Sequence, residues 1–119
     1  MTKQIMIVDD DGDTLELMQL ILECAGYDVR ASTTGKEIQQ GHPGDLPDLI
    51  LLDVKQAEDE GRALCKHLKT HEQTKEVPIL MLCTHAPVRQ LRKVCLADDF
   101  LAKPFELDTL LDKVEQHLL

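Results

Sequence analysis

The chain has 119 residues with 22 acidic and 13 basic side chains, which gives a formal net charge of −9. This length is typical of a single domain, and an acidic chain without a cluster of lysine and arginine lacks a footprint for nucleic-acid phosphates. The apolar runs are far shorter than the roughly 20 residues that span a bilayer, and the N-terminal residues have no signal-peptide pattern. We therefore expect neither a nucleic acid nor a membrane as a partner.

The cysteines are spread along the chain without the close pairs that bind metals or form redox motifs. They are Cys24, Cys65, Cys83 and Cys95. Such spacing is typical of reduced thiols that serve as small core residues in a cytoplasmic protein.

Short apolar runs predict five β-strands, which in chain order are residues 4–9, 27–31, 49–53, 77–83 and 100–102. The central run, Leu49–Leu52, has four consecutive branched aliphatic residues, so we expect a strand that is buried on both faces. It leads directly to Asp53, whose carboxylate is costly to desolvate unless water, a cation or a hydrogen-bond donor lies nearby. This carboxylate is therefore a candidate functional group.

Helical periodicity and helix-terminating residues predict five helices, at residues 13–25, 35–40, 61–71, 88–95 and 104–118. Asp13 is the expected N-cap of the first helix, with Glu16 at the spacing of a capping box. In the third helix we expect Ala63, Leu64 and Leu68 to be buried. The last helix has an apolar face that consists of Leu107, Leu110, Leu111, Val114 and Leu118.

Alternating strands and helices imply a doubly wound α/β fold, in which helices cover both faces of a five-stranded parallel sheet. In such a sheet, ligands bind outside the carboxyl ends of the strands. Five polar residues follow or end the predicted strands and should meet at this carboxyl edge of the sheet, which we call the rim: Asp9, Asp10, Asp53, Thr84 and Lys103.

These side chains have a definite chemistry. Three neighbouring carboxylates cannot all stay charged without a cation, and ligands that are all oxygen favour Mg²⁺. Thr84 supplies a hydroxyl donor, and Lys103 supplies a positive charge on a long stem. Together these groups are suited to the formation of an aspartyl phosphate, in which a carboxylate attacks phosphorus.

With these residues in this order, the chain resembles the response-regulator receiver domain of two-component signalling over nearly its whole length. The resemblance rests on the Asp9-Asp10 pair, Asp53, Thr84 and the segment Lys103-Pro104-Phe105. It implies one receiver domain over residues 1–119 with a flavodoxin-like sheet in the order 2-1-3-4-5. The segment between Thr84 and Phe100 is about one turn shorter than in the family, so the fourth helix should be short.

The resemblance also implies the residue roles. Asp53 would accept phosphate from a sensor histidine kinase or a phosphotransfer protein. Asp10, Asp53 and the backbone carbonyl of Lys55 would bind Mg²⁺, with Asp9 acting through water. Thr84 and Lys103 would hold the phosphoryl oxygens. The domain would catalyse only its own phosphorylation and dephosphorylation, so it would not be an enzyme for other substrates.

The resemblance further implies that phosphorylation would rearrange a surface of the domain, with Phe100 in the position of an aromatic switch residue. That surface would act on a downstream protein or on an output domain.

Several residues depart from the family pattern. Gln56-Ala57 stands where a Met-Pro pair is usual, Lys55 brings a positive charge to an acidic pocket, and His85 replaces a small residue. These departures leave an alternative open. The chain could be a pseudo-receiver, which acts as a protein-interaction module without phosphorylation.

Two other functions fit the acidic run Asp9–Leu15 less well. A haloacid-dehalogenase-type phosphatase motif would need one inserted residue, and the chain has no room for a cap domain. An EF-hand loop would need glycine at Thr14 and glutamate at Leu20, so we reject it.

Overall fold

The computed structural model describes residues 2–9, 11–32, 46–54, 58–83, 97–102 and 106–118. The described residues form a five-stranded parallel sheet in the order β2-β1-β3-β4-β5. The strands are β1 (Gln4–Val8), β2 (Asp28–Ser32), β3 (Leu49–Val54), β4 (Ile79–Cys83) and β5 (Asp99–Ala102). The described helices are α1 (Gly12–Cys24), α3 (Glu58–Thr70) and α5 (Leu107–Leu118).

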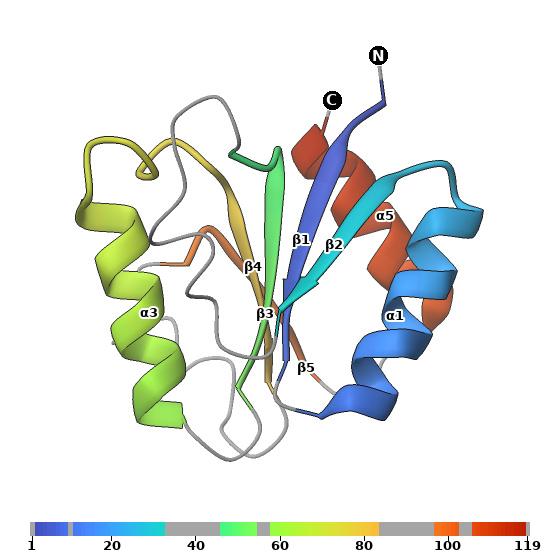
Figure 1. Cartoon of the computed structure of the whole chain (residues 1–119), viewed down its shortest axis with the longest axis horizontal. Helices are drawn as coiled ribbons and strands as arrows, with labels where there is room; N and C mark the ends of the chain where they lie inside the picture. Colours follow the sequence, from blue (N-terminus) through green and yellow to red (C-terminus); the bar gives the residue numbers. More distant parts are fainter. Residues whose placement is uncertain are drawn as a thin grey trace.

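The helices lie on both faces of the sheet, as expected for a doubly wound fold. Figure 1 shows α3 on one face and α1 with α5 on the other. The expected strand order is confirmed. The helices expected at residues 35–40 and 88–95 lie outside the described residues, and so does the expected shortening of the latter. Among the described helices, none is long and apolar enough to cross a membrane.

The sheet separates two apolar cores because successive strand residues point to opposite faces. In β1, Met6 and Val8 belong to the core under α3, whereas Ile5 and Ile7 belong to the core under α1 and α5. The central strand β3 is buried on both faces, with Leu49–Leu51 at 0% exposure. The expectation for this strand is therefore confirmed.

Helix α3 differs in two ways from the sequence expectation. It begins at Glu58 rather than Gly61, so the acidic segment expected to be a loop forms its first turn. Acidic residues are favourable in a first helical turn because negative charge is attracted by the positive N-terminal end of the helix dipole. Leu64 and Leu68 are buried as expected, but Ala63 is exposed, and Cys65 takes a buried position instead.

Some other burial expectations were also wrong. Cys24 is exposed at the end of α1, whereas Cys65 is buried as expected. In α5, Leu107 is the first residue of the helix and is 47% exposed. Leu110 and Val114 are fully buried, so the rest of the expected apolar face lies against the core.

The segment between α3 and β4 is held by a lysine–aspartate pair. The Lys69 ammonium donates to the carbonyl of Val77 at 3.1 Å and to Oδ2 of Asp98 at 2.8 Å. The same carboxylate oxygen of Asp98 accepts the backbone N–H of Ile79 at 2.8 Å. These contacts join the end of α3 to the first residue of β4 and to the approach to β5.

A second polar cluster ties β5 to α5. The carboxylate of Asp99, whose side chain is 16% exposed, lies 3.1 Å from the Lys113 ammonium and 3.1 Å from Nε2 of His117. It also accepts the backbone N–H of Phe100 at 2.8 Å. Burial raises the pKa of Asp99, but hydrogen bonds from His117, Phe100 and Lys113 outweigh it, so this pKa lies below its usual value.

This cluster predicts a pH-dependent contribution to stability. The folded-state pKa of Asp99 is lowered, so its charge stabilises the fold above the unfolded-state pKa of about 3.9 and ceases to do so as the pH falls through the lower folded value. Asp99→Asn should therefore lower the free energy of unfolding by about 1–2 kcal/mol at pH 7. The difference from wild type, measured by urea denaturation, should shrink below about pH 4.

The matched control is Asp112→Asn, which removes an exposed carboxylate from α5. It should change the free energy of unfolding by less than about 0.5 kcal/mol at either pH. An equal loss in both variants would mean that the cluster around Asp99 does not stabilise the fold specifically.

Candidate functional site

The ends of β1 and β3 bring two aspartate positions to one edge of the sheet. Val8 and Leu52 are partners in the parallel register, and Asp9 and Asp53 are the next residues along their strands. Neighbouring strands lie about 4.8 Å apart, so the backbones of these two aspartates are adjacent at the carboxyl edge. This is the edge at which open α/β sheets bind ligands.

Asp9 is an almost completely buried carboxylate. Its side chain accepts the backbone N–H of Asp11 at 2.9 Å, and the residue is only 1% exposed. Its own N–H donates to the carbonyl of Ser32 at 3.1 Å, which joins the rim to the end of β2. Burying a charged carboxylate is costly, so this position favours a positive charge close by.

Ser32 was not among the residues singled out from the sequence. The second strand was expected to end at Ala31, but it extends to Ser32, which is 4% exposed. A buried hydroxyl residue beside Val8 in the register extends the polar rim to β2. The only signal in the sequence was a hydroxyl residue directly after a predicted strand.

The third aspartate of the acidic run has a structural role. Asp11 is the N-cap of α1, because its carboxylate accepts the N–H of Asp13 at 3.1 Å and the hydroxyl of Thr14 at 2.9 Å. The expectation that Asp13 caps this helix was therefore wrong. The helix begins two residues earlier than that assignment implies because Asp11, not Asp13, can reach the first free amides.

The other candidate residues are placed less completely. Only the backbone of Asp53 is described, in β3 with Leu82 as its partner in β4. Asp10 and Lys55 lie outside the described residues, as do Thr84 and Lys103. The two strand residues that precede Thr84 and Lys103 in the sequence, Cys83 and Ala102, are partners in the register of β4 and β5.

Oxygen ligands at this edge suit a hard divalent cation. The buried carboxylate of Asp9 and the adjacent position of Asp53 fit the acidic site that Mg²⁺ requires. Among the described residues there is no group of three His, Cys, Asp or Glu side chains that could hold a metal. The expected ligand set also includes Asp10 and Lys55, which lie outside that part of the chain.

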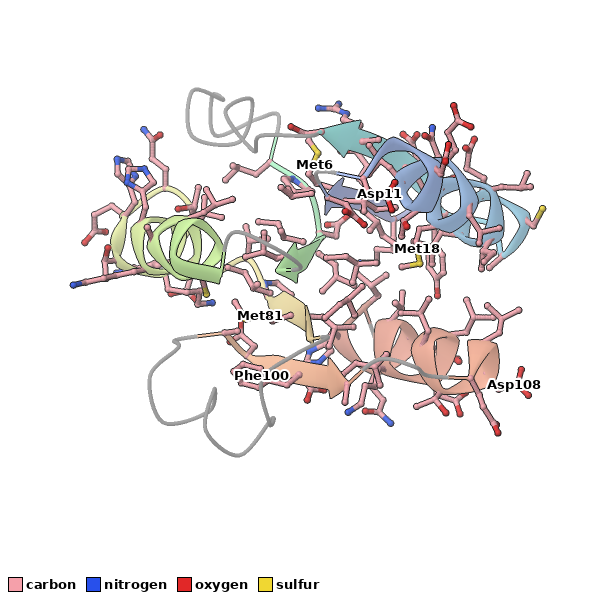
Figure 2. The ribbon with its side chains drawn as sticks, turned by 90° about the horizontal axis from the view of Figure 1, so that it is seen from below. Met6, Asp11, Met18, Met81, Phe100 and Asp108 are labelled. Carbon is pink, nitrogen blue, oxygen red and sulfur yellow. The ribbon has the colours of Figure 1, made fainter. Side chains whose placement is uncertain are left out.

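Phe100 is a core residue on the side of the sheet that α3 covers. It is 4% exposed and lies opposite Met81 in the register of β4 and β5, and both belong to the same core (Figure 2). Its inward position is that of a hydrophobic plug, and its expected role as a switch residue stays a prediction.

Helix α1 carries two leucines on its exposed surface. Leu17 is 58% and Leu20 is 61% exposed, and the helix starts from the acidic segment at Asp11. They lie on the opposite side of the helix from the buried residues Leu15, Met18 and Leu22. Large apolar side chains exposed together are typical of interaction surfaces.

Comparison with protein families and curated relatives gives a consistent result. The family model of the response regulator receiver domain matches residues 5–115. The DNA-binding dual master transcriptional regulator RpaA of Synechocystis is 34% identical over 113 residues, which are 93% of this chain and 47% of that protein. The alkaline phosphatase synthesis transcriptional regulatory protein PhoP of Bacillus subtilis is 38% identical over 88% of this chain and 44% of its own length.

Solved structures agree with these matches over the whole domain. The signal receiver domain of a signal transduction histidine kinase from Syntrophus aciditrophicus has a TM-score of 0.86 and 32% identity, over 98% of this chain and 90% of that one. The chemotaxis response regulator CheY4 of Vibrio cholerae has a TM-score of 0.83 and 27% identity, over 99% and 100%. The chain spans about half the length of the two curated relatives but all of CheY4.

The helix cap at the rim can be tested separately from any chemistry. Asp11→Ala removes two hydrogen bonds at the start of α1 and should lower the free energy of unfolding by about 1–2 kcal/mol. Asp13→Ala keeps the cap and should cost much less, and chemical denaturation of both variants would measure the difference. If Asp13→Ala were the more destabilising variant, the assignment of the cap to Asp11 would be wrong.

Proposed function

Since this chain belongs to the family of response regulator receiver domains, we propose that it is a phosphoacceptor that receives a phosphoryl group on Asp53. The family resemblance read from the sequence is confirmed by the match over residues 5–115. The observation that supports the chemistry best is the register that sets Asp53 beside the buried carboxylate of Asp9. The donor would be a phosphohistidine on a sensor histidine kinase or a phosphotransfer protein.

The transfer step needs little covalent chemistry from the protein. A carboxylate oxygen of Asp53 forms a bond to phosphorus while the bond between phosphorus and the histidine nitrogen breaks, and the electron pair stays on the imidazole. The hydroxyl of Thr84 and the ammonium of Lys103 would hold the phosphoryl oxygens. Hydrolysis of the acyl phosphate by water would return Asp53 to its starting state, so the domain would act catalytically only on itself.

Mg²⁺ would be held by Asp10, Asp53 and the backbone carbonyl of Lys55, with Asp9 acting through water. When bound, it would neutralise part of the charge on the phosphoryl oxygens. Asp9 would keep its place through its hydrogen bond from the N–H of Asp11, which fixes the carboxylate at the rim.

The phosphorylated domain would act through a changed surface on a downstream protein or on an output domain. Two of the curated relatives are named as transcriptional regulators and are about twice as long as the matched region. A location in the cytoplasm, where histidine kinases present their phosphohistidine, follows from this proposal.

The first test is intact-mass spectrometry of the full chain after incubation with acetyl phosphate and Mg²⁺. We expect a single phosphate adduct on the wild-type chain, and none on Asp53→Asn because an amide oxygen is a much poorer nucleophile than a carboxylate. Removing Mg²⁺ with a chelator should abolish the adduct, since the charge on the phosphoryl group would then be uncompensated.

Asp48→Asn is a suitable control, because Asp48 lies at the opposite end of β3 and accepts the N–H of Gln4. It should be phosphorylated like the wild type. If the wild-type chain took up no phosphate and bound no beryllofluoride, the phosphoacceptor proposal would fail, and a pseudo-receiver that acts as an interaction module would explain the fold.

We further infer that the exposed leucines of α1 contact the phosphodonor protein. Leu17→Glu with Leu20→Glu should slow phosphotransfer at least about tenfold, which corresponds to about 1.4 kcal/mol of lost interaction. The donor would be the kinase that labels the wild type fastest in a panel of phosphorylated sensor kinases. Labelling by acetyl phosphate should be unchanged, because that donor needs no protein surface.

Leu107→Glu is the matched control for this experiment. Leu107 is 47% exposed on α5, so the substitution adds a charge to the surface on another helix. It should leave both donors unaffected. A loss of labelling by acetyl phosphate in the α1 variant would point to damage at the rim rather than to a lost docking contact.

A further inference from the structure

Two histidines form a pair at the C-terminal end of α3. His67 and His71 are four residues apart, and the backbone N–H of His71 donates to the carbonyl of His67 at 3.1 Å, which continues the helical hydrogen bonding to His71. Their rings are stacked, with centroids 5.5 Å apart and an angle of 30° between the ring planes. Both residues are exposed to solvent.

We propose that His67 and His71 form a surface site for a divalent transition-metal ion. Two histidines four residues apart on one helix face can bind one metal ion together, as in helical zinc motifs. Bonds of about 2.0–2.1 Å to the metal require the two coordinating nitrogens to approach to about 3 Å. The rings are exposed and stacked, so they can tilt toward each other to bring two nitrogens to this distance without disturbing the core.

Metal binding would require a change of tautomer at His71, which has a small energetic cost. The backbone N–H of Gln73 points to Nδ1 of His71 at 3.4 Å, so Nδ1 is the acceptor and Nε2 carries the proton in the neutral ring. Coordination through Nε2 would move that proton to Nδ1 and remove this contact. The contact is long and exposed, so its loss costs little, and the amide of Gln73 becomes a reporter of metal binding.

The charges around the pair allow a cation. The C-terminal end of a helix carries a partial negative charge, which attracts positive ions. The ammonium of Lys69 is paired with Asp98 at 2.8 Å, and that of Lys75 lies 3.4 Å from Glu72. Lys66, next to His67 in the sequence, is exposed and opposes the cation. The net charge of −9 acts in favour of the cation.

The ligand set determines which metals bind. Imidazole suits Cu²⁺, Ni²⁺ and Zn²⁺, with Cu²⁺ bound most tightly, and it is a poor ligand for Mg²⁺. No third metal-binding side chain joins the pair among the described residues, so water would complete the coordination shell and the affinity would be moderate. Binding should weaken at low pH because protons compete for the ring nitrogens.

The pair lies far from the acidic rim. Strands β1 and β3 run toward the rim, whereas α3 runs back from it, so the C-terminal end of α3 is at the opposite end of the domain (Figure 1). A metal ion at His67 and His71 therefore needs no contact with Asp9 or Asp53. The proposal is independent of the proposed phosphorylation, and the two can fail separately.

The experiment titrates the ¹⁵N-labelled full chain with substoichiometric CuCl₂ in the presence of excess Mg²⁺ and records amide spectra. Paramagnetic Cu²⁺ should broaden the amides of residues 66–75 first, with that of Gln73 among the earliest. Calorimetric titration with NiCl₂ should give a site that His67→Ala or His71→Ala weakens at least about tenfold, since even outer-shell partners of metal ligands are worth about 10–100-fold.

His42→Ala is the control, because it removes a histidine outside the pair and should leave the Ni²⁺ affinity unchanged. Both substitutions in the pair are on the surface, and circular dichroism would verify that the variants are folded. Broadening that begins elsewhere in the chain, or a Ni²⁺ affinity that does not change in either variant of the pair, would overturn the proposal.

Discussion

The burial of β3 on both faces is the constraint on which the rest of the domain depends. Leu49–Leu51 are at 0% exposure and alternate between the two cores, so the strand needs helices on each side and a neighbour at each edge. Strands β1 and β4 supply those neighbours. Such a strand can carry a charged residue only near its end, where solvent begins. Hydrophobic burial thus places Asp53 at the rim beside Asp9.

The sequence predicted the elements of the fold better than their ends. Apolar runs locate strands because a strand in a parallel sheet is buried on both faces. Helix starts were harder to predict, because several neighbouring acidic residues can each cap a helix or occupy its first turn. Asp11 rather than Asp13 caps α1, and Glu58 rather than Gly61 begins α3. Local propensity does not distinguish these choices, which depend on where the preceding strand ends.

The sequence also predicted the candidate site only in part. That Asp9 and Asp53 share an edge follows from strand ends in a parallel sheet, but their adjacency depends on strand order, which came from the family resemblance and not from the hydrophobic pattern. Burial on helices was also uncertain from the pattern alone. Cys24 is exposed because it lies on the side of α1 opposite the buried residues Leu15 and Leu22, although cysteine usually prefers the core.

Strand β5 contacts the elements on both faces of the sheet, so a displacement of this strand would alter contacts on both faces. Its successive residues point to opposite faces, so Asp99 contacts Lys113 and His117 of α5 whereas Phe100 fills the core under α3. If phosphorylation of Asp53 displaced β5 toward the rim, the ionic contacts of Asp99 and the packing of Phe100 would have to change together. The cost of breaking a partly buried ion pair and opening a close-packed core at once favours two discrete positions of the strand over a gradual shift. Under the proposed function, this coupling through β5 would link phosphorylation of Asp53 to an altered surface on α5.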